Sequence, residues 1–284
     1  MRLITSIAEM RRLSRAERQE GKSLGLVPTM GALHEGHLSL VRHAQSQCDA
    51  AVVSIFVNPT QFGPGEDLAR YPRDLDRDIE ALSTLAPDAV FTPTAAEMYP
   101  QGFDTFVDPG EIATTLEGTA RPGHFRGVST VVLKLFHIVA PDAAYFGQKD
   151  FQQTAVIRRL VADLNLGVTV VVCPIVREPD GLAMSSRNAY LGAEDRKAAT
   201  VLHRALQRAE ALVFAGETDA DVVIGEMCQV FAAEPQAALD YAAVVEPEGL
   251  RPVERVVPGC VALVAARVGR ARLIDNVIFG QDRP

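Results

Sequence analysis

Two histidines near the start of the chain have the spacing and the setting of an anion-binding pair. His34 and His37 follow a short apolar run, residues 24–27, and a turn that contains Gly31, and an amphipathic pattern begins after them. This order predicts a strand, a tight turn and a helix, with both imidazoles on one face of the first helical turn. The N–H groups and the helix dipole favour an anion at that end. The pattern therefore indicates a phosphate site; the alternative is a surface turn with two incidental histidines.

A second candidate loop lies between an expected strand and an expected helix and reads Gly147-Gln148-Lys149-Asp150. Gly147 lets the backbone approach a ligand closely, and Lys149 is a mobile point charge suited to phosphate. Asp150 has the residue type that caps a following helix. Taken alone, this segment fits an ordinary strand-to-helix turn equally well.

A third loop, Met184-Ser185-Ser186-Arg187-Asn188, offers two hydroxyls and a guanidinium but no carboxylate. An arginine can grip phosphate oxygens with two parallel hydrogen bonds. By itself the loop could be an ordinary polar connection between domains. Its combination with the histidine pair is more specific, because two such segments bracket the triphosphate of ATP in enzymes that transfer a nucleotidyl group.

Side-chain amides form a further set of candidates, because they recognise a polar substrate without adding charge. Asn58 and Gln61 follow the expected strand 51–57, and Gln152 and Gln153 open the helix after Asp150. Gln61 and Gln153 lie where two strand ends could face one another, so we expect them to bind a substrate. For Gln152 we favour simple solvation at the surface.

Two other groups of polar residues point less specifically to a function. A run of acidic residues with a spacing of two would be scattered around a helix, so it predicts a solvated face rather than a metal site; its members are Asp74, Asp76, Asp78 and Glu80. His124 and Arg126 precede a strongly apolar helical pattern. They belong either to a loop over the site or to a helix cap.

Composition excludes several classes of function. The chain has 284 residues and a formal net charge of −8, which argues against nucleic-acid and anionic-membrane partners, since both need a positive field. No segment approaches the roughly 20 apolar residues of a membrane span, and the N-terminus has no signal-peptide pattern. The four cysteines are scattered, so we expect neither zinc nor disulfides, but thiols in a reducing cytoplasm.

Residues 1–176 alternate apolar strands with helical patterns. We expect strands at 24–27, 51–57, 89–92, 143–146 and 168–176, and helices at 74–85, 127–140 and 151–163, besides the helix after His37. Such alternation predicts an α/β fold with a doubly wound, Rossmann-like parallel sheet. Ligands then bind beyond the carboxyl ends of the strands, at the switch in strand order.

The character of the sequence changes after about residue 176. Long helical patterns at 194–214 and 219–231 precede short apolar runs at 241–245, 261–268 and 271–274. The turn at Gly269-Arg270 suggests an antiparallel hairpin. We therefore expect residues 177–284 to form a second, smaller α+β domain, hinged to the first.

Taken together, the segments resemble the pantoate–β-alanine ligase family, within the wider HxGH nucleotidyltransferase superfamily. The matching stretches cover nearly the whole chain in order; they are residues 27–37, 54–59 with Gln61-Phe62, 121–128, 146–153, 180–188 and 271–276. The resemblance implies a ligase that condenses (R)-pantoate with β-alanine through a pantoyl-adenylate, with ATP as substrate and AMP and diphosphate as products; from the scattered cysteines we expect it in the cytoplasm. It also implies Mg²⁺ bound through the ATP phosphates, a homodimer, and a place on the route to coenzyme A.

The resemblance also assigns residues, position by position. Its ATP-binding residues would be Met30, Gly31, Ala32, Leu33, His34, Glu35, Gly36, His37, Gly147, Gln148, Lys149, Asp150, Val176, Met184, Ser185, Ser186 and Arg187. The catalytic set would be His34, His37, Lys149, Ser185 and Arg187. Gln61 and Gln153 would bind pantoate, with Gln61 also near β-alanine, and the protein itself would supply no metal ligand.

The sequence departs from the family pattern at two positions and leaves rival functions open. Gln148 replaces a usual Glu, which puts its contact in doubt, and Thr60 replaces a common Met. The rivals are a nucleotidyltransferase that stops after pyrophosphate release, a fragment of an aminoacyl-tRNA synthetase, and a nucleotide sensor without catalysis. The net charge disfavours the synthetase fragment, and the paired amides disfavour the sensor.

Overall fold

The computed structural model describes residues 1–280 and divides the chain into two compact units. The first unit comprises Met1–Gly147 and Gln152–Pro174. The second comprises Gln148–Phe151 and the chain from Ile175 onward. The short segment Gln148–Phe151 thus interrupts the first unit in sequence but packs with the second.

The first unit is built on a six-stranded sheet in which every adjacent pair of strands is parallel. The strands are β1 (Arg2–Ile4), β2 (Leu24–Thr29), β3 (Ala50–Ile55), β4 (Ala89–Phe91), β5 (Ala143–Gly147) and β6 (Thr169–Cys173), in the spatial order β1-β4-β3-β2-β5-β6. The central strands consist mainly of apolar residues that are buried on both faces, as parallel sheets covered by helices require. The predicted doubly wound α/β fold is confirmed.

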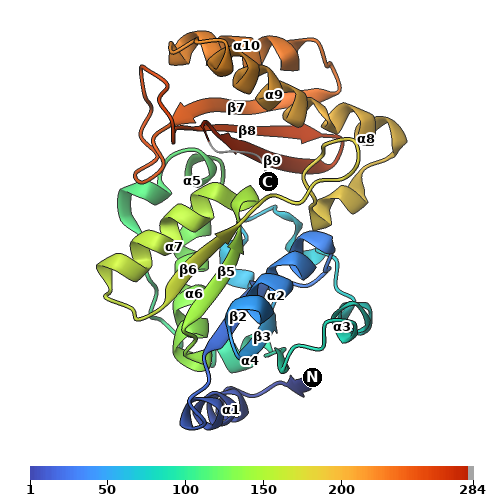
Figure 1. Cartoon of the computed structure of the whole chain (residues 1–284). Coiled ribbons are helices and arrows are strands. Elements are labelled where there is room, and N and C mark those ends of the chain that lie inside the picture. The colour runs from blue at the N-terminus through green and yellow to red at the C-terminus, as the bar shows by residue number, and fades with distance from the viewer. Residues whose placement is uncertain (281–284) are drawn as a thin grey trace. The chain divides into compact units, whose positions relative to one another are not determined.

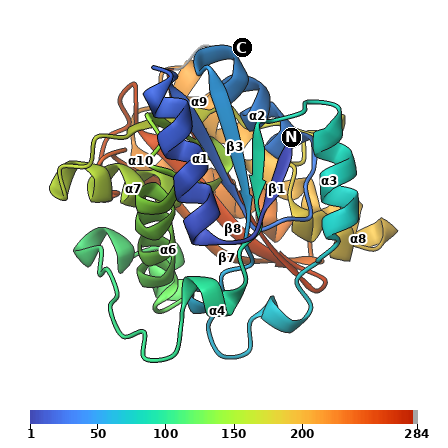
Figure 2. The same ribbon diagram turned by 90° about the horizontal axis from the view of Figure 1, so that it is seen from below.

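Helices cover both faces of this sheet. They are α1 (Ile7–Gln19), α2 (Glu35–Gln47), α3 (Leu75–Ser83), α4 (Ala95–Met98), α5 (Glu117–Ala120), α6 (His124–Val139) and α7 (Phe151–Asp163). Figure 2 shows α1 and α6 on one side of the strands and α2 and α3 on the other. The strand order reverses beside β2, because β3 lies on one side of it and β5 on the other. The turns after β2 and β5 therefore leave the sheet at the switch point where such folds bind ligands.

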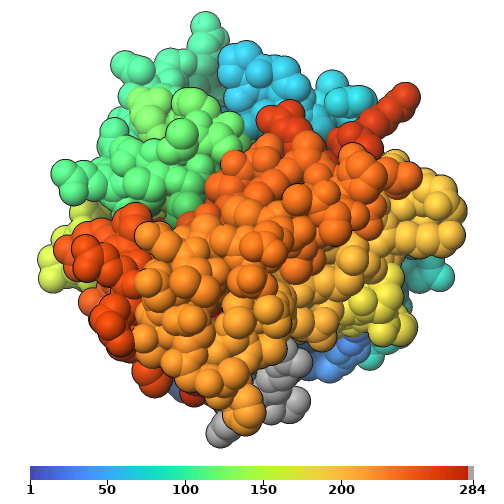
Figure 3. All heavy atoms as spheres, turned by 90° about the horizontal axis from the view of Figure 1, so that it is seen from above, coloured from blue at the N-terminus to red at the C-terminus, as the bar shows by residue number. Residues whose placement is uncertain are grey.

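The second unit is an antiparallel three-stranded sheet with helices on one face (Figure 1). Its strands are β7 (Ala237–Val245), β8 (Val261–Val268) and β9 (Ala271–Ile278), and its helices are α8 (Ala193–Ala199), α9 (Val201–Phe214) and α10 (Ala220–Ala232). Apolar residues of α9 and α10 pack on alternate residues of β8 in a single core. The opposite faces of these helices form the outer surface of the unit in Figure 3.

Short 3₁₀ helices complete the two units. They are η1 (Pro59–Gln61), η2 (Asp67–Ala69), η3 (Gly110–Ala113), η4 (Gln148–Asp150) and η5 (Ser186–Tyr190). Three of them, η1, η4 and η5, contain or adjoin residues that the sequence marks as substrate-binding.

The structure differs from the sequence-based expectation at several elements. The sequence analysis missed β1 and α1: the strand has only three residues, and α1 buries little besides Met10 and Leu13. The single helix expected over 194–214 is interrupted at Thr200. There the Thr200 hydroxyl donates to the Lys197 carbonyl at 2.7 Å, a local bond that competes with the helical ladder.

None of the helices formed by residues 1–280 combines the length and the apolar character needed to cross a membrane.

Close packing of α6 on η1 requires a glycine at position 127. A Cβ there would lie 2.3 Å from the Thr60 carbonyl oxygen and 2.6 Å from the Gln61 Cα, both backbone atoms that cannot turn aside. We expect Gly127→Ala to lower the free energy of unfolding by about 2–3 kcal/mol, as overpacking does.

Gly225 in α10 is the matched control, because a Cβ there would meet none of the described atoms within 4 Å. Gly225→Ala should raise the free energy of unfolding by up to about 1 kcal/mol. Urea denaturation of both variants measures the difference. Equal stability of the two variants would show that α6 and η1 are not in close contact.

Candidate active site

The histidine turn has the predicted construction of strand, turn and helix. β2 ends at Thr29, Gly31 (φ +83°) and Ala32 (φ +50°) take left-handed backbone conformations, and α2 begins after His34 as its N-cap residue. The N-terminal end of α2 therefore follows the carboxyl end of β2 after a short turn, and such a helix end favours an anion.

A hydrogen bond within the histidine pair defines how His37 can act. The Nδ1 atom of His37 accepts the backbone N–H of His34 at 3.4 Å, and the two rings lie 4.1 Å apart between centroids. In a neutral imidazole with Nδ1 as acceptor, the hydrogen sits on Nε2. His37 therefore presents Nε2–H as a donor while its other nitrogen braces the turn.

Asp78, which lies near the start of α3, anchors the backbone of the histidine turn. Its two carboxylate oxygens accept the backbone N–H groups of Leu33 at 2.7 Å and of Ala32 at 3.0 Å. Asp78 is only 3% exposed, so the prediction of a solvated acidic face was wrong at this position, although Asp74, Asp76 and Glu80 are exposed. Burial raises the pKa of the Asp78 carboxyl, and the two N–H bonds oppose that rise.

Gln61, expected to bind pantoate, is buried beside this turn. Its Oε1 accepts from Asn58 Nδ2 at 3.0 Å, while its Nε2 lies 3.2 Å from the sulfur of Met30. Because a thioether is a weak acceptor, the amide N–H groups can turn to a stronger acceptor such as a carboxylate. Asn58 is held in turn by the Tyr99 hydroxyl at 2.7 Å and by the Gly127 carbonyl at 3.2 Å.

His124 supports the backbone of Gln61. It is the first residue of α6, its Nδ1 lies 2.8 Å from the Gln61 carbonyl oxygen, and its Nε2 lies 3.0 Å from Arg121, which pairs with Glu66 through two bonds. Since Arg121 only donates, Nε2 accepts and Nδ1–H donates to Gln61. Burial, reinforced by the Arg121 charge, lowers the pKa of His124 to about 4. His124 is not the helix cap considered from the sequence, because Gly123, which has no side chain, is the N-cap of α6; the ring instead supports the backbone of η1.

The two glutamines at the start of α7 have different environments. Gln152 is buried; its side chain accepts from the Glu117 backbone N–H at 2.9 Å and donates to the carbonyls of Ile112 and Thr115. The expectation of surface solvation was therefore wrong for Gln152, which ties a loop to α7. Gln153 is half-buried, and its role in binding pantoate stays a prediction.

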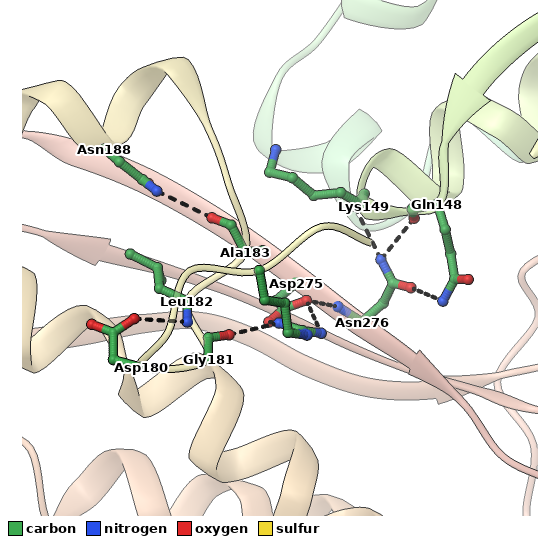
Figure 4. A network of polar contacts seen from close by, with 10 residues as sticks. Gln148, Lys149, Asp180, Gly181, Leu182, Ala183, Asn188, Asp275 and Asn276 are labelled. Atoms are coloured by element: carbon green, nitrogen blue, oxygen red, sulfur yellow. Dashed lines mark hydrogen bonds and ion pairs between the residues drawn. The ribbon is translucent and has the colours of Figure 1, made fainter. Parts of the chain in front are cut away.

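The loop at Gln148–Asp150 belongs to the second unit and is held by β9. Asn276 donates to the carbonyls of Gln148 at 2.9 Å and Lys149 at 3.0 Å, and the Gln148 amide donates to Asn276 Oδ1 at 3.2 Å (Figure 4). Gln148, which stands where the family usually has Glu, thus hydrogen-bonds Asn276. The Lys149 side chain is 20% exposed and lies 3.5 Å from Asp150.

The Met184–Arg187 loop lies in the same unit. Met184 N–H donates to the carbonyl of Val176 at 3.0 Å, which joins two residues that the sequence assigns to the nucleotide. Ser185 is the N-cap of η5 and accepts the Arg187 backbone N–H at 3.3 Å. The structure thus brings Met30, His34, His37 and Gln61 together in one unit, and the loops of Lys149 and Arg187 together in the other.

Sequence reasoning did not identify the residues that hold these turns in that role, although it considered His124 and Asp78 in other roles. Asp78, His124, Asp275 and Asn276 are all buried and polar. A usable signal existed for Asn276, since an Asp-Asn pair in a strand of otherwise apolar character is an unusual place for polar side chains. No comparable signal marks Asp78, because it is one of four acidic residues in a short segment.

The lowered pKa of His124 makes stability depend on pH. The folded protein keeps this imidazole neutral, whereas the unfolded chain takes up a proton near the ordinary pKa of 6.5. The unfolded state therefore binds more protons between pH 6.5 and about 4, so the stabilisation is complete above pH 6.5 and is lost as the pH falls to about 4, by up to about 3 kcal/mol.

We expect His124→Asn, which keeps an N–H donor but does not titrate, to lose less stability than the parent chain over this interval. Urea denaturation at pH 7, 5.5 and 4.5 measures the difference. If both proteins lose the same free energy of unfolding on acidification, His124 is not the neutral, buried group described.

Comparison with known proteins is consistent with this geometry. The chain matches the pantoate-beta-alanine ligase family over residues 2–278. It is 58% identical to the pantothenate synthetase of Roseiflexus sp. strain RS-1 over 279 residues, with 98% of this chain and 99% of the relative covered.

Solved structures show the same architecture over nearly the whole chain. A pantothenate synthetase from Thermus thermophilus superposes with a TM-score of 0.92 at 46% identity, covering 98% of this chain and 99% of that one. A pantoate-beta-alanine ligase from Francisella tularensis, complexed with beta-gamma ATP and beta-alanine, superposes with a TM-score of 0.81 at 35% identity, covering 98% and 97%. This chain belongs to the pantoate–β-alanine ligase family, enzymes that form an amide bond.

Proposed function

We propose that the chain condenses (R)-pantoate with β-alanine at the expense of ATP, giving pantothenate, AMP and diphosphate. One observation carries the assignment of the site: Gln61 contacts Met30, next to the histidine turn. A helix N-terminus suited to phosphate and a buried amide suited to a carboxylic acid therefore lie side by side in one unit. The Francisella tularensis relative, which was solved with an ATP compound and beta-alanine, supports the choice of substrates.

In the first step, a carboxylate oxygen of pantoate attacks the α-phosphorus of ATP. The new P–O bond forms as the bond from Pα to the bridging oxygen breaks, and diphosphate leaves with the electron pair. Donors that oppose this growing negative charge accelerate the step; we assign this role to His34, His37, Lys149, Ser185, Ser186 and Arg187. The Nε2–H of His37 is the donor whose tautomer the structure accounts for.

In the second step, the neutral amine of β-alanine attacks the carbonyl carbon of the pantoyl-adenylate. The C–N bond forms, the C–O bond to phosphate breaks, AMP leaves, and the ammonium proton passes to solvent. No enzyme nucleophile is needed, so the protein contributes position and electrostatics. Gln61 and Gln153 would hold pantoate, and Gln61 would also border β-alanine.

The two halves of the chain would divide these tasks. Residues 1–176 would bind nucleotide and pantoate, while residues 177–284 would act as a lid that keeps water from the mixed anhydride. The lid carries the loop at Gln148–Phe151, which packs with the second unit. ATP would contact residues of all three loops and one further residue: Met30 to His37, Gly147 to Asp150, Met184 to Arg187, and Val176.

Magnesium would enter with the nucleotide. Among residues 1–280, no group of three His, Cys, Asp or Glu side chains is placed to hold a metal ion. Mg²⁺ keeps most of its ligands as water and phosphate oxygens, so the ATP triphosphate is its expected site. Bound there, Mg²⁺ would offset the negative charge of the leaving diphosphate.

We also propose a homodimer without nucleic-acid or membrane partners, located in the cytoplasm. The formal net charge of −8 disfavours polyanionic partners. All four cysteines are free thiols, which suits a reducing compartment.

One assay distinguishes this function from its rivals: AMP formation from ATP in the presence of pantoate, with and without β-alanine. We expect sustained AMP formation only when both acids are present. Diphosphate is measured in the same reactions. Diphosphate release without free AMP and without any need for β-alanine would indicate a nucleotidyltransferase that stops after the first step, and neither product under any condition would indicate a nucleotide sensor.

Removal of His37 should act on turnover rather than on folding. We expect His37→Ala to reduce kcat by about 10²–10³-fold, the usual effect of losing one such donor, while its thermal unfolding stays close to that of the parent. His43→Ala, an exposed position on the same helix, is the control. Parental turnover in His37→Ala would exclude His37 from the mechanism.

The neighbouring glutamines of α7 provide a matched pair for the pantoate site. Loss of a hydrogen bond to a charged substrate costs about 1.5–3 kcal/mol, so Gln153→Ala should raise the KM for pantoate roughly 10–100-fold and leave the KM for ATP nearly unchanged. Gln152→Ala should instead lower the melting temperature, because three backbone groups lose their partner and two of these hydrogen bonds are buried. An unchanged pantoate KM in Gln153→Ala would contradict the assignment.

A further inference from the structure

Two adjacent polar residues in β9 have no part in the chemistry above, although they lie in one of the stretches that carry the family resemblance. Asp275 and Asn276 are 2% and 1% exposed, in the middle of a strand that pairs with β8 along its whole length. Buried polar side chains are expensive unless their hydrogen bonds are satisfied. Their partners therefore indicate what these residues do.

Asn276 uses both ends of its amide on a single loop. Its Nδ2 donates to the carbonyls of Gln148 and Lys149 at 2.9 and 3.0 Å, and its Oδ1 accepts from the Gln148 side chain at 3.2 Å (Figure 4). This pattern needs two donors and one acceptor in a short side chain, which only asparagine combines at this length. The peptide groups before and after the Cα atom of Lys149 are thereby fixed.

Asp275 holds the other phosphate loop through Arg177. Its oxygens pair with the Arg177 guanidinium at 2.6 and 3.0 Å, and the same guanidinium donates to the Gly181 carbonyl at 3.0 Å. Arg177 also pairs with Ala183 in an antiparallel bridge, directly before Met184. The segment that leads into the Ser185–Arg187 cluster is thus fixed to the neighbouring position of the same strand.

We propose that Asp275 and Asn276 are positioning residues that fix the two triphosphate loops of the second unit relative to each other. The two anchors are adjacent in a strand, with Cα atoms about 3.8 Å apart, so Lys149 and the Ser185–Arg187 cluster can move only as one piece. This inference rests on the proposed function of those loops. It predicts that neither anchor touches a substrate and that both affect the ATP-dependent step.

The test uses Asn276→Asp in the full-length chain, with the pantoate-dependent exchange of diphosphate into ATP as the readout. The new carboxylate would oppose two carbonyl oxygens and displace the loop, and misplacement of a binding group by about 1 Å can cost about 10²-fold in rate. We expect a loss of that order in kcat for exchange at a temperature where the variant is fully folded, and a KM for pantoate within about threefold of the parent. The melting temperature should fall, because the carboxylate is buried. Asn165→Asp, the same chemical change at an exposed turn, should have no effect.

The pH profile separates positioning from a purely structural role. The carboxyl at position 276 would face the carbonyls of Gln148 and Lys149 and the Gln148 amide, next to the Asp275 carboxylate. This setting favours the protonated form, which can donate to one carbonyl. The activity of Asn276→Asp relative to the parent should therefore rise as the pH is lowered from 8 to 6.

A double variant shows whether Asn276 acts through Lys149. Asn276→Asp should cost at least tenfold less in a Lys149→Ala background than in the parent, because the group that it positions is already gone. Asn276→Ala, which introduces no charge, should behave in the same way and serves if Asn276→Asp does not fold.

Three results would overturn the inference alone: equal fold-losses in both backgrounds, parental exchange rates in both Asn276 variants, or losses that disappear at temperatures where the variant is fully folded. Parental exchange in Lys149→Ala would remove the loop from triphosphate binding, and the proposed role of Lys149 would fail together with the inference.

Discussion

The structure depends on buried polar side chains that hold short turns at the ends of strands. A turn that presents its own N–H groups and side chains to a ligand cannot also use them to stabilise itself, so a group from another element must hold it. Asp78 does so for the histidine turn, His124 for the backbone of Gln61, and Asn276 for the loop of Lys149. Each anchor is buried, and each hydrogen-bonds at least one backbone group of the turn that it holds.

This arrangement suits an enzyme that supplies no nucleophile of its own. Since a carboxylate and an amine form the new bonds, rate enhancement must come from donors held where negative charge develops. Rigid anchors reduce the reorganisation needed at that moment. They also explain why neutral His124 and buried Asp78 lie close to the candidate site without a role as acid or base, since each hydrogen-bonds backbone groups. Because the pKa of His124 is lowered, this arrangement makes the folded protein less stable at acidic pH.

The sequence was sufficient for the fold class and for most of the long elements, because apolar periodicity and the alternation of strands and helices are local signals. The helix over 151–163 and the strand over 261–268 have the expected bounds. Prediction from the sequence failed where hydrophobic periodicity does not decide the structure. β1 is too short to show a hydrophobic period, and Thr200 interrupts a continuous helical pattern. Asp78 is buried although the neighbouring acidic residues are exposed. The proposed substrate roles of His37 and Gln61 rest on motif resemblance, whereas the residues that anchor their turns are visible only in the folded structure, where distant segments meet.

The central claim is that the carboxylate of pantoate is activated as its AMP ester, and the fate of its oxygen atoms tests this claim most directly. With pantoate labelled by ¹⁸O in the carboxylate, attack on the α-phosphorus followed by amide formation must transfer one labelled oxygen to the phosphate of AMP. The account predicts AMP that carries one ¹⁸O atom per turnover, detected by mass spectrometry. AMP without label, or label in inorganic phosphate released together with ADP, would contradict it.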